Sequence, residues 1–380
     1  MRDAADRLAY QRELVAAAKR LGLPARGDIE RSLIDHATET IRKWITAHGK
    51  PRDLSELLER VATSFLVEIV EIHDDSDITA LLERIPPTSE PVLARLAAEL
   101  DDTTDAVILQ RQHRADWDMP FLAVINCRGW HRSRRYFSKW HEVIHLLLDG
   151  KQLRFAFRKR ATKRKHPEEV LVDKIAGELA FHPDLFGPVI HSKLETSGRL
   201  TFDVVERVRA EIAPDASRES ALYACVRHCP DPVFFLKAKL GYKNSERRQL
   251  DDLLSGLDDA NLPEPKLRVQ SSSANDAASR SGIRFHENMQ VPETSLVSAA
   301  YNGRGDRADG QEPLELWQTS DGGPIGRGGI GIEAFRRGDE VWCLVRLHSG
   351  ASGTRALRAR VNRGMEKPPS RVRDARNSAP

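Results

Sequence analysis

One segment, from about Ser133 to Leu148, constrains the fold of this chain more than any other. Drawn as a helix, it carries apolar side chains almost all the way round, namely Phe137, Trp140, Val143, Ile144, Leu146, Leu147 and Leu148. Gly150 follows, at a position where glycine commonly ends a helix. A helix that is apolar all round is typical of the interior of a domain, so the polar side chains on it need partners.

Two histidines and a glutamate lie on this helix, in the run His141-Glu142-Val143-Ile144-His145. Histidines four residues apart project from one helix face, so both imidazoles can bind one Zn²⁺ at about 2.0–2.1 Å. Glu142 lies about 100° round from His141, where it can act as a general base without binding the metal. The pattern predicts a catalytic zinc site. Its alternative is a helix with two hydrogen-bonded histidines and a surface glutamate.

A catalytic zinc needs a third protein ligand and one open position. The helix predicted to open at Pro167 offers Glu168, Glu169 and Asp173, and helical projection does not separate the two glutamates. Glu169 and Asp173 are one turn apart, so one carboxylate could bind zinc while the other accepts the N–H of a zinc histidine. Acidic residues also begin helices because they interact favourably with the helix dipole, which is the alternative interpretation.

The runs RRYFSKWHEVIH and PEEVLVDKIAGELAFHP resemble the ImmA/IrrE metallopeptidase family, which combines an HExxH helix with a downstream glutamate helix. The resemblance covers roughly residues 53–242. It implies a mainly helical, zincin-like α+β domain with a small β-sheet, in which Zn²⁺ is held by His141, His145 and Glu169. It further implies that Glu142 is the base. The spacing of Glu169 and Asp173 also resembles the wider class of zinc peptidases with a glutamate third ligand, in which the aspartate orients a histidine.

The same resemblance implies a protein substrate, often a regulatory protein such as a helix-turn-helix repressor. The chain departs from the family pattern beside the ligands, with Trp140 where alanine is usual and Ile144 where glycine is common. These larger side chains bear on substrate preference. Three residues are candidates for stabilising the oxyanion, namely Tyr136, His166 and His182.

Changes in composition divide the 380 residues into five parts. We expect an N-terminal helical extension at 1–50, a metallopeptidase domain at 51–260, a linker at 261–282, a small β-rich accessory module at 283–349 and a disordered tail at 350–380. Strands are predicted at 65–72, 106–112 and 121–127 in the first domain, and at 296–302, 313–318 and 340–347 in the module. The glycine-rich run from Gly326 to Gly331 is expected to form turns.

Charge and cysteine content favour a soluble, cytoplasmic protein that does not enter a membrane. The 59 basic and 56 acidic residues leave a net charge of +3, so only a local patch, the basic stretch 151–165, could bind nucleic acid. Four cysteines do not make a disulfide framework, and charges near the start replace the apolar run of a secretory signal. The rival hypothesis is a regulatory DNA- or protein-binding protein whose zinc site is structural or vestigial.

Overall fold

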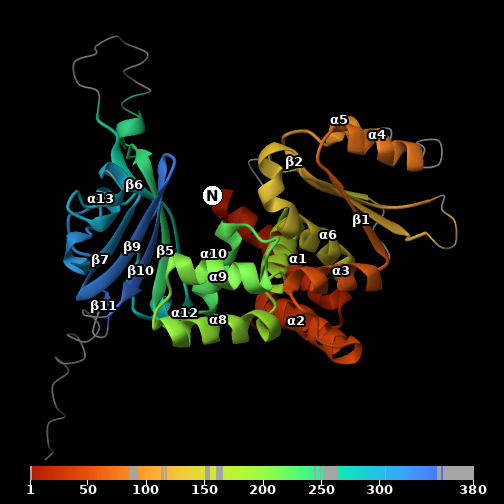
Figure 1. Cartoon of the computed structure of the whole chain (residues 1–380), viewed down its shortest axis with the longest axis horizontal. Helices are drawn as coiled ribbons and strands as arrows, with labels where there is room; N and C mark the ends of the chain where they lie inside the picture. Colours follow the sequence, from red (N-terminus) through yellow and green to blue (C-terminus); the bar gives the residue numbers. More distant parts are fainter. Residues whose placement is uncertain are drawn as a thin grey trace, which may run out of the picture. The chain divides into compact units, whose positions relative to one another are not determined.

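The computed structural model is α+β, as predicted, and divides into two compact units, Met1–Cys225 and Val226–Pro380 (Figure 1). The structure describes residues 2–85, 93, 95–112, 115, 118–149, 155–159, 166–243, 245–248, 250, 263–303, 305–348 and 352–353. In this part of the chain no helix is both long and apolar enough to cross a membrane. All four cysteines are buried, and none is joined in a disulfide.

The first unit is built on a four-stranded sheet with the order β1-β3-β2-β4. Its strands are β1 (Val67–Ile72), β2 (Thr104–Gln110), β3 (Phe121–Asn126) and β4 (Phe155–Lys159). β1 and β3 are parallel, whereas the other neighbours are antiparallel. The three strands predicted in this domain are therefore confirmed to within a few residues, and β4 is an additional strand.

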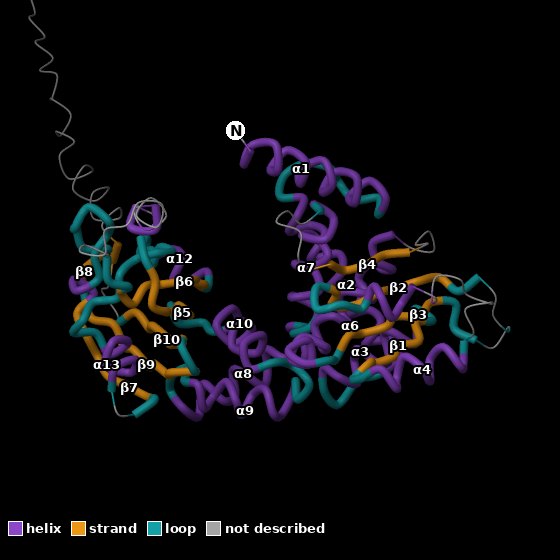
Figure 2. The backbone as a smooth tube through the Cα atoms, turned by 90° about the horizontal axis from the view of Figure 1, so that it is seen from above, coloured by secondary structure: helices purple, strands orange, loops and turns teal. Residues whose placement is uncertain are grey.

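Helices cover both faces of this sheet, which explains why β3 is buried along its whole length. On one face, α4 (Asp75–Arg84) and α5 (Leu96–Glu99) share a core with alternate residues of the strands, including Ile72, Leu122 and Val124. On the other face lies α6 (Arg135–Asp149), which contacts β2 and β3 (Figures 1 and 2). The helix with the His-Glu-x-x-His run is thus an interior helix, as its apolar pattern predicts.

The remaining helices of the first unit are α1 (Arg2–Arg20), α2 (Ile29–His48), α3 (Leu54–Ser64), the 3₁₀ helix η2 (Gly129–Arg134), α7 (Pro167–Leu179), α8 (Pro183–Ser197), α9 (Phe202–Ile212) and α10 (Arg218–His228), which runs across the boundary between the units. Of these, α1, α3, α7 and η2 contact α6. Asp53 caps α3 by accepting a hydrogen bond from the Glu56 N–H at 2.8 Å. Pro167 occupies the first turn of α7, as predicted.

The N-terminal helices, expected as an extension, belong to the same compact unit as the sheet. Both α1 and α2 contact α7. Glu30 of α2 joins the three helices, because its Oε2 accepts hydrogen bonds from the Tyr10 hydroxyl at 2.8 Å and from Lys174 Nζ at 2.7 Å. These helices therefore pack against the helix that carries the predicted third ligand.

The second unit is built on a five-stranded antiparallel sheet with the order β6-β5-β10-β9-β7 (Figure 2). Its strands are β5 (Val233–Gly241), β6 (Lys266–Ala274), β7 (Arg307–Pro313), β9 (Gly329–Arg337) and β10 (Glu340–Leu347). The shorter elements are α12 (Asp276–Arg280), α13 (Leu296–Asn302), the 3₁₀ helix η5 (Leu314–Leu316), and the paired strands β8 (Gly326–Arg327) and β11 (Ser352–Gly353). One core, which includes Phe234, Phe285 and Trp317, joins the sheet to α12 and α13.

Several predictions for this half of the chain are wrong. The expected linker at 261–282 contains β6 and α12, and the units divide at Cys225 and Val226 instead. The expected strand 296–302 is α13, capped by Ser295, and 313–318 contains η5. The glycine-rich run contributes to β8 and β9 as well as to the turn between them. Only the strand at 340–347 is confirmed.

Two predicted features lie largely outside the described residues. Of the predicted tail at 350–380, the structure describes only β11. Of the basic stretch 151–165, it describes only the backbone of β4.

Candidate metal centre

Packing of α6 against α7 brings three predicted metal ligands together. His141 Nε2 lies 3.0 Å from Glu169 Oε2 and 3.1 Å from His145 Nε2, and His145 Nε2 lies 3.4 Å from Glu169 Oε1. Both histidines are buried, whereas 26% of the Glu169 side chain is exposed. The three donors therefore converge on one point that solvent reaches from the Glu169 side.

These separations match those of a tetrahedral zinc site. Ligand atoms at about 2.0–2.1 Å from Zn²⁺ in tetrahedral geometry lie about 3.3–3.4 Å from each other. The donor set of two imidazoles and one carboxylate is also one that zinc enzymes use, with the fourth position left for water or substrate. The residues present thus fit a catalytic zinc ion in both chemistry and spacing.

The electrostatics of the cluster favour a cation. Burial would raise the pKa of Glu169, but the hydrogen bonds and charges of His141 and His145 hold it far below its ordinary value. Burial would lower the pKa of His145, yet the hydrogen bond to Glu169 and the charges of Glu142 and Glu169 raise it overall. The carboxylate therefore stays ionised, and the imidazoles face negative charge that a divalent cation would share.

Asp173 lies where a residue that orients a zinc histidine is needed. Its Oδ1 is 2.9 Å from His141 Nδ1. An ionised carboxylate only accepts hydrogen bonds, so Nδ1 is the donor in this contact, and Nε2 is the ring nitrogen that remains to bind a metal. That nitrogen is the one that faces Glu169 and His145.

The two glutamates that the sequence could not separate occupy different positions. Glu169 belongs to the three-donor group, whereas Glu168 Oε2 is 4.0 Å from Nδ1 of the exposed His166. Glu168 acts on the cluster through its charge, which helps to raise the pKa of His145. Glu142, the predicted base, is 1% exposed, and its charge also acts on His145.

Two of the three candidates for the oxyanion position make structural contacts. The Tyr136 hydroxyl donates to the Ala180 carbonyl oxygen at 2.7 Å, and burial raises the Tyr136 pKa well above its usual value. His182 Nε2 donates to the Thr38 carbonyl oxygen at 3.2 Å, and burial lowers the His182 pKa. His166 precedes α7, with 69% of its side chain exposed, and is the candidate with a ring accessible to a substrate.

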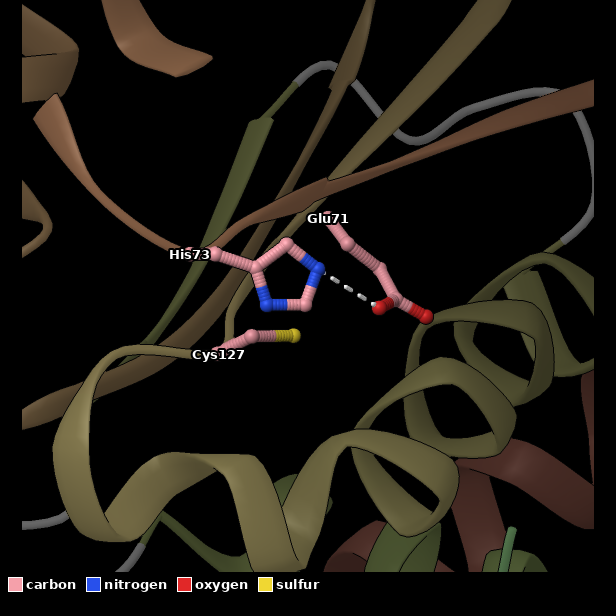
Figure 3. A group of neighbouring side chains, drawn as sticks. All are labelled: Glu71, His73 and Cys127. Carbon is pink, nitrogen blue, oxygen red and sulfur yellow. Dashed lines mark ion pairs between the residues drawn. The ribbon is translucent and has the colours of Figure 1, made fainter. Parts of the chain in front are cut away.

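Sequence reasoning missed a second group of donor side chains, formed by Glu71, His73 and Cys127 (Figure 3). A Glu-x-His pair at the end of one strand and a cysteine just after another are the available signals. They become informative only once β1 and β3 are known to be parallel neighbours.

The chain matches no model of a known protein family, and no characterised protein matches it either.

Proposed function

We propose that this protein is a zinc-dependent endopeptidase that hydrolyses peptide bonds in a protein substrate. The convergence of His141, His145 and Glu169 within ligand-to-ligand distance is the observation that carries the proposal. A structural zinc is usually closed by four protein ligands, often cysteines, whereas three ligands of the His, His, Glu type are typical of catalytic sites. The resemblance to the ImmA/IrrE motifs supports a zincin-like domain and a regulatory protein, such as a repressor, as substrate.

The chain's own residues divide the chemistry between them. A bound Zn²⁺ would polarise the scissile carbonyl and lower the pKa of a coordinated water from 15.7 toward about 7. Glu142 accepts the proton of the attacking water and passes it to the leaving amine. Asp173 holds the His141 ring in the tautomer that presents Nε2, and Glu169 completes the donor set as an ionised carboxylate.

Replacing the predicted base tests this proposal. Glu142→Gln preserves the shape of the side chain but cannot accept the proton, so cleavage should fall by about 10²–10⁴-fold, the usual contribution of general acid–base catalysis. Zinc content should not change, because Glu142 is not a ligand. The measurement is hydrolysis of a quenched fluorescent peptide library by zinc-loaded protein, with Glu168→Gln as the matched control.

Equal activity of wild type and Glu142→Gln would contradict the assignment of the base. Tight zinc binding without cleavage by the wild type would contradict the peptidase proposal and favour the alternative of a regulatory binding protein with a structural or vestigial zinc.

A further inference from the structure

Three side chains with metal-binding atoms lie together at one end of the sheet in the first unit. Glu71 is near the end of β1, His73 follows that strand, and Cys127 follows β3. β1 and β3 are parallel and in register, with Ile72 beside Asn126, and the Cys127 N–H donates to the Ile72 carbonyl oxygen at 2.8 Å. The carboxyl ends of the two strands therefore deliver the three side chains to the same edge.

The alternation of a strand also places them on the same face. Ile72 and Val124 pack with α4 and α5, so Glu71, His73 and Cys127, at the alternate positions, fall on the side of α6. A contact from α6 agrees with this, because Lys139 Nζ lies 2.5 Å from Glu71 Oε1. The pairing of β1 with β3 and the alternation of side chains along each strand are therefore what place the three residues on one face.

The donor atoms of the three residues are close enough to share an ion. One donor atom from each lies within 4.8 Å of the others, and His73 Nε2 is 3.2 Å from Glu71 Oε2 (Figure 3). Lys139 holds the other carboxylate oxygen of Glu71, which fixes the direction in which Oε2 points. The cluster is thus supported by a neighbouring helix as well as by the sheet.

Exposure differs across the cluster in a way that suits a ligand from solvent. Cys127 is 3% exposed and forms the buried side, whereas 48% of the His73 side chain is exposed. An ion could enter on the imidazole side and reach the sulfur without opening the fold. The same side would leave a coordination position for water.

The environment of Cys127 argues against its use as a nucleophile. Burial and the nearby Glu71 carboxylate raise its pKa to about 12, although the charges of Arg135 and Lys139 partly oppose this. A thiol with such a pKa is almost entirely protonated at neutral pH and is therefore unreactive. A divalent metal ion favours the deprotonated form of the thiol, since it binds the thiolate and displaces the proton.

We propose that Glu71, His73 and Cys127 form a second metal site, separate from His141, His145 and Glu169, that takes a divalent ion of the zinc class. Sulfur, imidazole nitrogen and carboxylate oxygen together favour Zn²⁺ over Mg²⁺ or Ca²⁺, which take oxygen ligands. Binding breaks the S–H bond of Cys127, forms a sulfur–metal bond and releases the proton to solvent. The thiolate and the Glu71 carboxylate then balance the charge of the ion.

Cobalt distinguishes the two sites, because only the second contains sulfur. The full chain is freed of metal under reducing conditions and titrated with Co²⁺, and near-ultraviolet absorption is recorded for thiolate-to-cobalt charge transfer. The proposal predicts this band in the wild type and its loss in Cys127→Ser. His73→Ala, which changes an exposed side chain, should weaken cobalt binding at this site by at least about tenfold, the lower end of the cost of losing a partner of a metal ligand.

The controls separate this proposal from the peptidase proposal. His145→Ala, which disables the other site, should retain the band, and so should Cys229→Ser, because Cys229 belongs to no three-donor group among the described residues. A wild type that shows no thiolate band in excess Co²⁺ would overturn the proposal. A band that persists in Cys127→Ser, or an unchanged cobalt affinity in His73→Ala, would overturn it as well.

Discussion

Asp173 Oδ1 accepts a hydrogen bond from His141 Nδ1 at 2.9 Å, on the side of the imidazole opposite the nitrogen that faces Glu169 and His145. One carboxylate on α7 thus contacts one side of the ring, and another, one turn earlier, approaches Nε2 on the other side. The spacing of four residues on α7 is what allows both contacts to be made from one helix face.

Removing this hydrogen bond should weaken zinc binding without removing a ligand. Asp173→Ala leaves His141 without the partner that fixes its tautomer, and losses of this kind cost about 10–100-fold in metal affinity. Competition with a chromophoric chelator measures the affinity. Glu178→Ala, later on the same helix and outside the three-donor group, is the control. Equal affinities in Asp173→Ala and wild type would show that the contact does not support the site.

Trp140 is expected to be important for stability of the first unit. It is completely buried on α6, next to His141, at a position where the resembling family usually has alanine. Trp140→Ala should lower the free energy of unfolding by about 3–5 kcal/mol, because the deleted side chain leaves a cavity. Chemical denaturation of the full chain measures this, with Trp130→Ala, at 43% exposed, as a control that should cost less than about 1 kcal/mol. A comparable cost for both would mean that neighbouring side chains fill the space.

Asp105 is a buried charge that connects the sheet to the segment that leads into α6. On β2, its carboxylate oxygens lie 2.9 Å from His131 Nδ1 and 3.2 Å from Arg134 Nε, and both partners belong to η2, which leads directly into α6. Asp105→Ala leaves these partners without their buried carboxylate and should destabilise the fold by about 3–5 kcal/mol. The exposed neighbour Asp102→Ala is the control, again by denaturation. A cost for Asp105→Ala no larger than the control's would show that water replaces the ion pair.

The parts of the site that local sequence could predict are those that lie on single helices. Spacing places His141 and His145 on one face of α6, and Glu169 and Asp173 on one face of α7. The structure brings these two faces together. Spacing could not choose Glu169 over Glu168, since both begin α7, and the choice depends on how α7 packs against α6. Spacing therefore predicts the general arrangement, whereas the choice of Glu169 from the sequence depends on the resemblance to the metallopeptidase motif.

The parts that sequence could not predict depend on contacts between distant segments. Cys127 approaches His73 only because β1 pairs in parallel with β3, and no local periodicity specifies which strands become neighbours. The sequence of β6 predicts a linker because its serine-rich stretch lacks the apolar pattern of a strand, and pairing with β5 stabilises the strand. The short apolar run of α13 does not distinguish helix from strand by itself, and the helix is marked only by its Ser295 cap.

The most direct test of the central claim is the zinc content of matched ligand variants after dialysis against a weak chelator. The measurement uses a Cys127→Ser background, so that only the site formed by α6 and α7 can contribute. The account predicts about one zinc per chain in this background and in its Glu168→Gln derivative, and almost none after Glu169→Gln or His145→Ala. Equal zinc content in Glu169→Gln and Glu168→Gln would contradict the assignment of Glu169 as the third ligand, and an absence of zinc from all of these proteins would contradict the metal centre itself.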